Sequence, residues 1–210
     1  MKKLLSIFAC SLILSNSSFA SGSHHAHDHK HEHKVHYKKF IVDTAHTTVG
    51  FSVRHMVISN VKGKFKQFEG KIKVNDQNVL HSFDLNMKAA SIDTDNDNRD
   101  KHLRNSDFFD ADKYPEIKFR STKVIPLGGN EYKVIGDFTM KSTTKPVTLM
   151  LELNGPIKDP WGNTRLGASV KGKVNRKDFG LNFHKVMDAG GLLVGDEIKV
   201  EIELESIFKK

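Results

Sequence analysis

The chain has 210 residues, with 33 Lys and Arg, 25 Asp and Glu, 12 His and one Cys, which gives a formal net charge of +8. This length suits one domain with short appendages, and a hydrophobic content of 38% excludes a disordered chain. Beyond the first 20 residues, no apolar run reaches the roughly 18 residues that a membrane-spanning helix needs.

Residues 1–20 have the parts of a secretory signal peptide. Lys2 and Lys3 form a basic start, an apolar core covers residues 4–14, and small residues surround a plausible cleavage point after Ala20. The alternative, a short membrane anchor, would need a longer apolar segment. The only cysteine, Cys10, lies in the apolar core, so the mature protein has no thiol for a disulfide or a cysteine nucleophile. We therefore expect a secreted protein.

A histidine-rich tail follows at residues 21–36, with the sequence HHAHDHKHEHKVH over its last thirteen positions. Neutral imidazole binds zinc, nickel and copper, so one hypothesis is metal binding by this flexible tail. The other hypothesis is a solvated linker. A catalytic metal site is not expected, because a tail lacks the rigid surroundings that orient metal ligands. The candidate metal ligands are His24, His25, His27, His29, His31 and His33.

From residue 37 onward, apolar and polar residues alternate with the period of two that is typical of half-buried antiparallel strands. The clearest case is 198–204, where every second residue is Ile, Val or Leu and the residues between them are Lys or Glu. Turn residues such as those at 128–130 and 159–163 separate the runs. Eight to ten strands in this order predict a sandwich or a barrel, and closure into a barrel removes exposed edges. Further runs with the same alternation are 49–53, 83–89, 132–140 and 147–153.

The run from 168 to 174 bears on what the interior of a barrel would hold. Its expected inward side chains are all small, and a wall of small side chains leaves space for one ligand. The alternative is that large aromatic residues on facing strands fill this space. The inward set would be Ala168, Val170, Gly172 and Val174.

Residues 91–112 break the strand pattern. Asp97 and Asp100 are three positions apart, which resembles the capping arrangement of a short helix near 97–105. Such a helix would turn Leu103 toward the body of the protein. We therefore predict a short helical insertion in an otherwise all-β chain.

The acidic residues of this insertion do not form an EF-hand calcium loop. A loop that starts at Asp93 would need Gly and Glu where the chain has Asn98 and Arg104. Two interpretations remain for the mixed charges here, an acid–base cluster or a polar network that fixes an irregular segment against a barrel rim. The composition favours the network. The residues concerned are Arg99, Asp100, His102 and Asp107.

Several sequence blocks between Asp43 and Phe208 carry a resemblance to a known family. They are FSVRHM with VKGKFKQFEGKI, then SIDTDNDNRDKHLRNSDFFDADKYPEIKF, KPVTLMLEL, NRKDFGL and VGDEIKVEIELE. Together they resemble the YceI-like polyisoprenoid-binding family, although Ser142 stands near a turn where that family tends to have Gly. The resemblance implies that residues 37–210 form an extended, antiparallel, lipocalin-like β-barrel of about eight strands. It also implies secretion to the periplasm and an enclosed isoprenoid chain, as in a quinone or a polyprenol derivative.

The expected strand phase gives candidates for the wall of an isoprenoid cavity. Each CH₂ moved from water into an apolar cavity contributes about 0.8 kcal/mol, so apolar lining alone can hold such a chain. The wall candidates are Val49, Phe51, Val53, Phe65, Phe83, Leu85, Met87, Phe138, Val170 and Val174. The resemblance supplies candidates for the polar end of the ligand, for which structural pairing is the alternative: His55, Arg99, His102, Arg176 and Asp178.

We thus expect a periplasmic carrier for an isoprenoid quinone or a related amphiphilic lipid, with no covalent chemistry and no required cofactor. The alternatives are a metal-handling module that uses the histidine tail and an isoprenoid-modifying enzyme. The sequence has neither a G-x-S-x-G nucleophile elbow nor a His-Glu metal-binding helix, which argues against the enzyme. A homodimer is left open.

The positive charge is uneven along the chain. Residues 37–210 carry a net charge of +6, and within them residues 91–112 carry −4, so the rest carries +10. Nucleic acid is not an expected partner, because the chain lacks a basic platform interleaved with aromatic residues. A basic body instead favours transient contact with the anionic surface of a membrane.

Overall fold

The computed structural model describes residues 36–183 and 193–210 of the chain. The predicted signal peptide and the candidate metal ligands His24, His25, His27, His29, His31 and His33 lie outside the described residues, so both stay predictions. The strands are β1 Tyr37–Val42, β2 Thr48–His55, β3 Ser59–Phe65, β4 Phe68–Asn75, β5 Leu80–Lys88, β6 Ile92–Asp93, β7 Glu116–Gly128, β8 Glu131–Met140, β9 Thr143–Lys158, β10 Thr164–Asn175 and β11 Val194–Lys209. The helices are α1 Asp97–Arg104 and the short 3₁₀ turns η1 Thr44–His46, η2 Ala89–Ser91 and η3 Arg176–Phe179.

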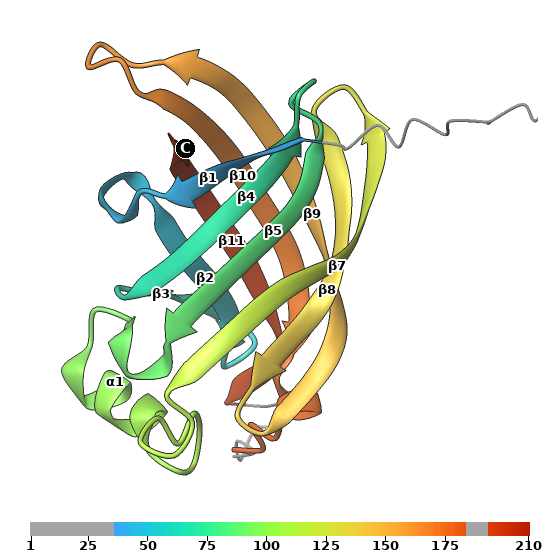
Figure 1. Cartoon of the computed structure of the whole chain (residues 1–210). Helices are drawn as coiled ribbons and strands as arrows, with labels where there is room; N and C mark the ends of the chain where they lie inside the picture. The colour runs from blue at the N-terminus through green and yellow to red at the C-terminus, as the bar shows by residue number, and fades with distance from the viewer. Residues whose placement is uncertain (1–35, 184–192) are drawn as a thin grey trace, which may run out of the picture. The chain divides into compact units, whose positions relative to one another are not determined.

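Eight strands close into an antiparallel barrel (Figure 1) in the order β1-β4-β5-β7-β8-β9-β10-β11, with β11 pairing back to β1. The last part of β11 pairs with β1, from Ser206 to Lys209. Its earlier part, from Val194 to Glu203, pairs with β2 instead. β2 pairs in turn with β3, and β3 with the short β6. The predicted all-β, antiparallel barrel of about eight strands with one short helix is thus confirmed.

The period-two patterns place the core as the sequence predicts. On β9, Val147, Leu149, Leu151 and Leu153 are buried while the residues between them are exposed. β8 alternates in the same way around Val134. Because successive side chains of a strand point to opposite faces, this burial pattern confirms the expected strand phase.

Helix α1 matches the predicted helix to within one residue, but its cap differs. Asn96 is the N-cap, and its side chain accepts a hydrogen bond of 2.9 Å from the backbone N–H of Arg99. The predicted capping pair of Asp97 and Asp100 is therefore wrong. Leu103 packs against the core, as expected. Within the described residues, α1 and the 3₁₀ turns are all too short or too polar to cross a membrane.

The barrel has two unlike ends, which we call the packed end and the hollow end. The β7–β8 and β9–β10 hairpins lie at the packed end, while α1, the β2–β3 hairpin and η3 lie at the hollow end (Figure 1). The packed end is filled by large inward side chains, each at most 2% exposed: Phe40, Ile72, Val74, Val134, Leu151, Leu166 and Val170. None of these residues lines the internal cavity described below.

The small-residue run on β10 does not mark the cavity. Ala168, Val170 and Val174 are buried as predicted, yet only Val174 of the inward set lines the cavity. Beside Gly172 the space is already taken, because a Cβ there would collide with the Leu149 side chain. A large residue on the neighbouring strand therefore fills this part of the interior, as the alternative interpretation held.

Candidate ligand-binding cavity

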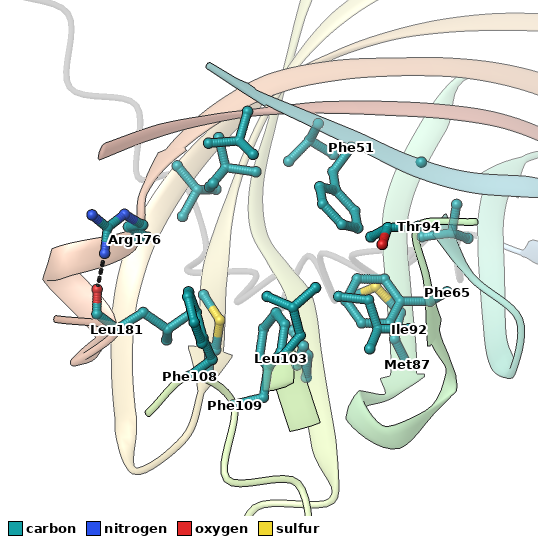
Figure 2. A pocket seen from close by; sticks show the side chains of 18 of the residues that line it. Phe51, Phe65, Met87, Ile92, Thr94, Leu103, Phe108, Phe109, Arg176 and Leu181 are labelled. Carbon is teal, nitrogen blue, oxygen red and sulfur yellow. Dashed lines mark hydrogen bonds between the residues drawn. The ribbon is translucent and has the colours of Figure 1, made fainter. Parts of the chain in front are cut away.

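A cavity of about 290 Å³ lies inside the hollow end of the barrel. Its wall comes from inward residues of the barrel strands, and residues of α1 and the segment after it close it on one side (Figure 2). Small-molecule sites in proteins usually measure roughly 300–1,000 Å³, so this cavity is near the lower limit. In the described conformation it can hold a short apolar chain or one part of a long one.

Most of the predicted site residues line this cavity. On β2, β3 and β5 they sit on the inward face, and Phe51, Phe65 and Met87 lie close together in Figure 2. Whether they contact a ligand stays a prediction. The predicted residues that line the cavity are Val49, Phe51, Val53, His55, Phe65, Phe83, Leu85, Met87, Arg99, His102, Phe138, Val174 and Arg176.

Two predicted site residues do not line the cavity. Val170 faces inward but is fully buried at the packed end, so its assignment to the wall is wrong. Asp178 lies on the outside, where its half-exposed carboxylate is 3.0 Å from the ammonium of Lys145. Its assignment to the polar end of a ligand is therefore wrong as well, because it does not face the interior.

An aromatic group closes the cavity on the side of α1, and sequence reasoning did not single it out. Phe108 and Phe183 pack with their ring centroids 4.8 Å apart, and Phe109 packs edge-on against Phe65 at 6.0 Å. Phe108 and Phe109 belong to the SDFFDAD block that carried the family resemblance, which was the available signal. On β7, β9 and β11, the alternation of apolar and polar residues is the sequence signal for further residues that line the cavity. These are Ile117, Phe119, Val147, Leu149, Ile198, Val200 and Ile202.

Arg176 is the most deeply buried charge of the site, at 2% exposure. Its guanidinium donates to the carbonyl oxygens of Leu181 at 2.5 Å (Figure 2) and Gly195 at 2.9 Å, and to the Asp196 carboxylate at 3.1 Å. A buried charge is stable only when it is paired and hydrogen-bonded, and these contacts meet that need. Arg176 thus joins η3 to the start of β11.

Thr94 and Asp100 form the second polar group at the cavity. The Thr94 hydroxyl donates to the Asp100 carboxylate at 2.5 Å, and the Thr94 backbone N–H donates to the same carboxylate at 3.0 Å. Arg99 donates to the Thr94 hydroxyl at 2.7 Å and to the Thr94 carbonyl at 2.8 Å. These bonds tie α1 to the segment before it, which is what the polar-network interpretation predicted.

His102 forms a separate polar contact among the residues that line the cavity. Its Nε2 lies 2.9 Å from the carboxylate of Asp107, and its ring packs edge-on against Phe108 and Phe183. Nearby, Lys66 forms an ion pair of 2.8 Å with Asp93, and this contact holds the pKa of the Asp93 carboxyl below its usual range. Arg99 and Asp100 of the insertion thus bond to Thr94, His102 contacts Asp107, and Asp93 pairs with Lys66 outside the insertion.

The chemistry available at the cavity is mostly that of apolar contact. The polar side chains among the described lining residues are His55, Thr94, Arg99, His102 and Arg176. Over 36–183 and 193–210, the lining includes no carboxylate, lysine, serine or cysteine. Its polar groups are thus suited to fixing the orientation of a ligand, while apolar burial supplies the affinity.

One group of possible metal ligands occurs among the described residues, and none of its members lines this cavity. Asp43, His46 and Glu205 offer ligand atoms within 4.8 Å of one another. The guanidinium of Arg165 already occupies the centre of this group, 2.7 Å from Asp43 and 2.9 Å from Glu205. A cation placed there would be repelled by the arginine, so the group is an ion-pair cluster.

The fold and the cavity define a class, a closed antiparallel β-barrel with an apolar internal cavity. The YceI-like domain model matches residues 40–206, which is most of the chain. The chain therefore belongs to the YceI-like family.

Curated relatives and solved structures agree with this assignment. A UPF0312 protein of Photorhabdus laumondii is 38% identical over 179 residues, which cover 85% of each chain. A UPF0312 protein of Staphylococcus aureus is 36% identical over 169 residues, which cover 79% of this chain and 95% of the relative. The crystal structure of a Campylobacter jejuni YceI protein is 34% identical with a TM-score of 0.65, covering 80% of this chain and 96% of that one.

A second solved structure extends the likeness at the level of fold alone. It is described as a polyisoprenoid-binding domain from Saccharophagus degradans implicated in plant cell wall breakdown, and it is 12% identical with a TM-score of 0.61. It covers 83% of this chain and 99% of that one.

Proposed function

We propose that this protein is a carrier that encloses the isoprenoid chain of a lipid in its barrel cavity, without covalent chemistry. The observation that supports this most directly is the cavity itself, which is apolar on nearly all sides and lies inside a closed barrel. The description of the Saccharophagus domain as polyisoprenoid-binding agrees with this class of ligand.

Physical chemistry favours a branched apolar chain in such a cavity. Burial of each CH₂ contributes about 0.8 kcal/mol, so a few isoprene units supply useful affinity without a strong polar contact. Met87 and Met140 on the wall can adapt their shape to methyl branches, because methionine is flexible and polarizable. His55, Arg99 and His102 offer donors for a polar head group, such as that of a quinone.

The predicted signal peptide supports a periplasmic location for this carrier. A lipid with a long isoprenoid chain is insoluble in water, so its movement through an aqueous compartment requires a protein that covers the chain. The proposal is therefore a periplasmic carrier for an isoprenoid quinone or a related amphiphilic lipid.

The test is extraction of the protein purified from its native host, followed by mass spectrometry of the bound lipid. We expect about one isoprenoid lipid per chain. Val174→Phe should lower this amount strongly, because the new ring would project into the cavity. The matched control is Lys173→Gln, the neighbouring residue on the outer face of the same strand. An unliganded native protein, or bound lipids without isoprene units, would contradict the proposal.

A further inference from the structure

The β2–β3 hairpin exposes an apolar tip at the hollow end of the barrel (Figure 1). The tip consists of Met56, Val57 and Ile58, between the paired residues His55 and Ser59. Their exposed fractions are 40%, 57% and 79%. Turns exposed to water usually consist of polar residues, Gly or Pro, so three consecutive exposed apolar residues at a turn are unusual.

The backbone of this tip is also unusual. Met56 and Val57 have φ angles of 50° and 65°, and the N–H of Ile58 donates to the His55 carbonyl at 3.2 Å. Positive φ at both central positions of a hairpin turn favours Asn and Gly, and a β-branched residue there is strained. Local stability therefore does not account for Val57 at this position, and such strain points to a functional role.

The charged residues of the β2–β3 hairpin itself are all positive, whereas Asp196 and Glu197 on the facing part of β11 form ion pairs with Lys173, Arg176 and Lys177. Residues 54–66 contain Arg54, Lys62, Lys64 and Lys66 and no acidic residue. Over the described residues, no carboxylate oxygen lies within 4.0 Å of the charged nitrogens of Arg54, Lys62 or Lys64. An apolar tip flanked by unpaired cations is the combination that binds the interface of an anionic bilayer.

The tip is directly connected to the cavity wall. The N–H of Met56 donates to the carbonyl of Leu193 at 3.0 Å, and His55 pairs with Val194. His55, Leu193 and Val194 all line the cavity. A surface that receives the tip would therefore lie beside the hollow end.

The acidic insertion and the exposed apolar residues of the packed end bear on which surface of the protein would face a membrane. Residues 91–112, at the same end as the tip, carry a net charge of −4 and would be repelled by anionic lipid. Trp161 and Ile157 are exposed by 80% and 65%, but they lie at the β9–β10 hairpin of the packed end. Approach along the basic β2–β3 hairpin is therefore the favoured one.

We propose that the tip Met56–Ile58 docks the protein on an anionic phospholipid bilayer and brings the hollow end against the membrane. A lipid can then pass between bilayer and cavity with little exposure to water. The nature of the transferred lipid rests on the proposed function, whereas docking itself does not.

The test measures binding of the full purified chain to vesicles by flotation. One set contains equal parts of phosphatidylglycerol and phosphatidylcholine, and the other contains phosphatidylcholine alone. We expect binding to the anionic set that weakens as salt is raised, and a loss of at least about tenfold in the double variant Val57→Asn with Ile58→Asn. The matched control, Ile157→Asn with Trp161→Asn, removes exposed apolar residues from the packed end and should change binding less than about twofold.

Folding does not confound this comparison. Asparagine tolerates positive φ better than valine, so the tip variant should unfold at the same or a higher urea concentration than the unmodified protein. Absence of binding to anionic vesicles would overturn the proposal, as would an equal loss in the tip variant and its control. A concentration-dependent dimer that disappears in the tip variant would also overturn it, since a second copy would then cover the tip.

The same preparations separate this inference from the proposed function. Protein that carries an isoprenoid lipid but does not float with anionic vesicles would overturn docking and leave the carrier proposal standing. Protein that floats through its tip but carries no isoprenoid lipid would contradict the carrier proposal and leave docking standing.

Discussion

The packed end and the hollow end of the barrel share most of their strands but differ in what their interiors hold. On β10, Val170 and Val174 face the same interior four residues apart, and only Val174 meets empty space. An eight-stranded barrel is just wide enough for side chains to fill, so the packed end is the ordinary outcome. The hollow end needs a separate explanation.

That explanation lies in the sector next to β11. At the packed end, β1 alone connects β11 to β4. At the hollow end, β2 takes the place of β1 beside β11, and β3 and β6 follow it. Because barrel diameter grows with the number of strands, the additional chain widens the wall there. Inward side chains therefore fill the interior at the packed end, whereas at the hollow end they only line a cavity.

Truncation of core leucines at the two ends should give the largest contrast. Leu166 is fully buried at the packed end, and Leu166→Ala should lower the free energy of unfolding by about 3–5 kcal/mol. Leu103 already borders the cavity, and Leu103→Ala should cost only about 1–2 kcal/mol because fewer contacts are lost. Urea unfolding of both variants measures the difference. Equal losses would show that the hollow end is as tightly packed as the other.

Replacement of each of the two valines on β10 by Phe should also destabilise the packed end more than the hollow end. The difference in the free energy of unfolding should be smaller than for the leucines. Val170→Phe must fit a ring into a filled interior and should lower the free energy of unfolding by about 1–3 kcal/mol. Val174→Phe can place its ring in the cavity, so its effect should stay below about 1 kcal/mol. The measurement is again urea unfolding. A greater loss in Val174→Phe than in Val170→Phe would contradict the comparison.

Acid should weaken the ion-pair cluster of the packed end. The Arg165 guanidinium, followed by His46, lowers the pKa of Asp43 from 3.8 to about 2. For Asp159, burial acts to raise the pKa, but hydrogen bonds led by that from Arg165 lower it from 3.8 to about 2. Since both folded pKa values lie below 3.8, this stabilisation is present above about pH 4 and is lost as the pH falls toward 2.

The variant Asp43→Asn tests this expectation. It should unfold at a lower urea concentration than the unmodified protein at pH 5, and the difference should shrink as the pH falls from about 4 toward 2. Urea midpoints at several pH values measure the effect. A difference that stays constant over this range would mean that Asp43 stabilises the fold without its charge.

Most of the barrel could be predicted because its exterior is polar. Strict alternation on β8, β9 and β11 fixes which side chains face inward, and those faces are buried as expected. The helix could be placed but its cap could not. Asn96 and Asp97 are both good N-cap residues, so sequence spacing does not choose between them.

The position of the cavity could not be predicted by the same means. Alternation shows that Val170 points inward, but the space around it depends on side chains from distant strands. The case of Asp178 is similar, because closeness in the chain suggests a pair with Arg176. In the 3₁₀ turn η3 the two side chains point apart, and Arg176 instead pairs with Asp196 across the fold.

The two-part pairing of β11 also bears on how the barrel closes. Val42 pairs with Ser206, 164 residues later in the sequence. Contacts between such distant segments fold slowly, because loop-closure entropy must be overcome first. The ring thus stays open until the end of β11 reaches β1, and the unpaired edges of both strands are exposed until then.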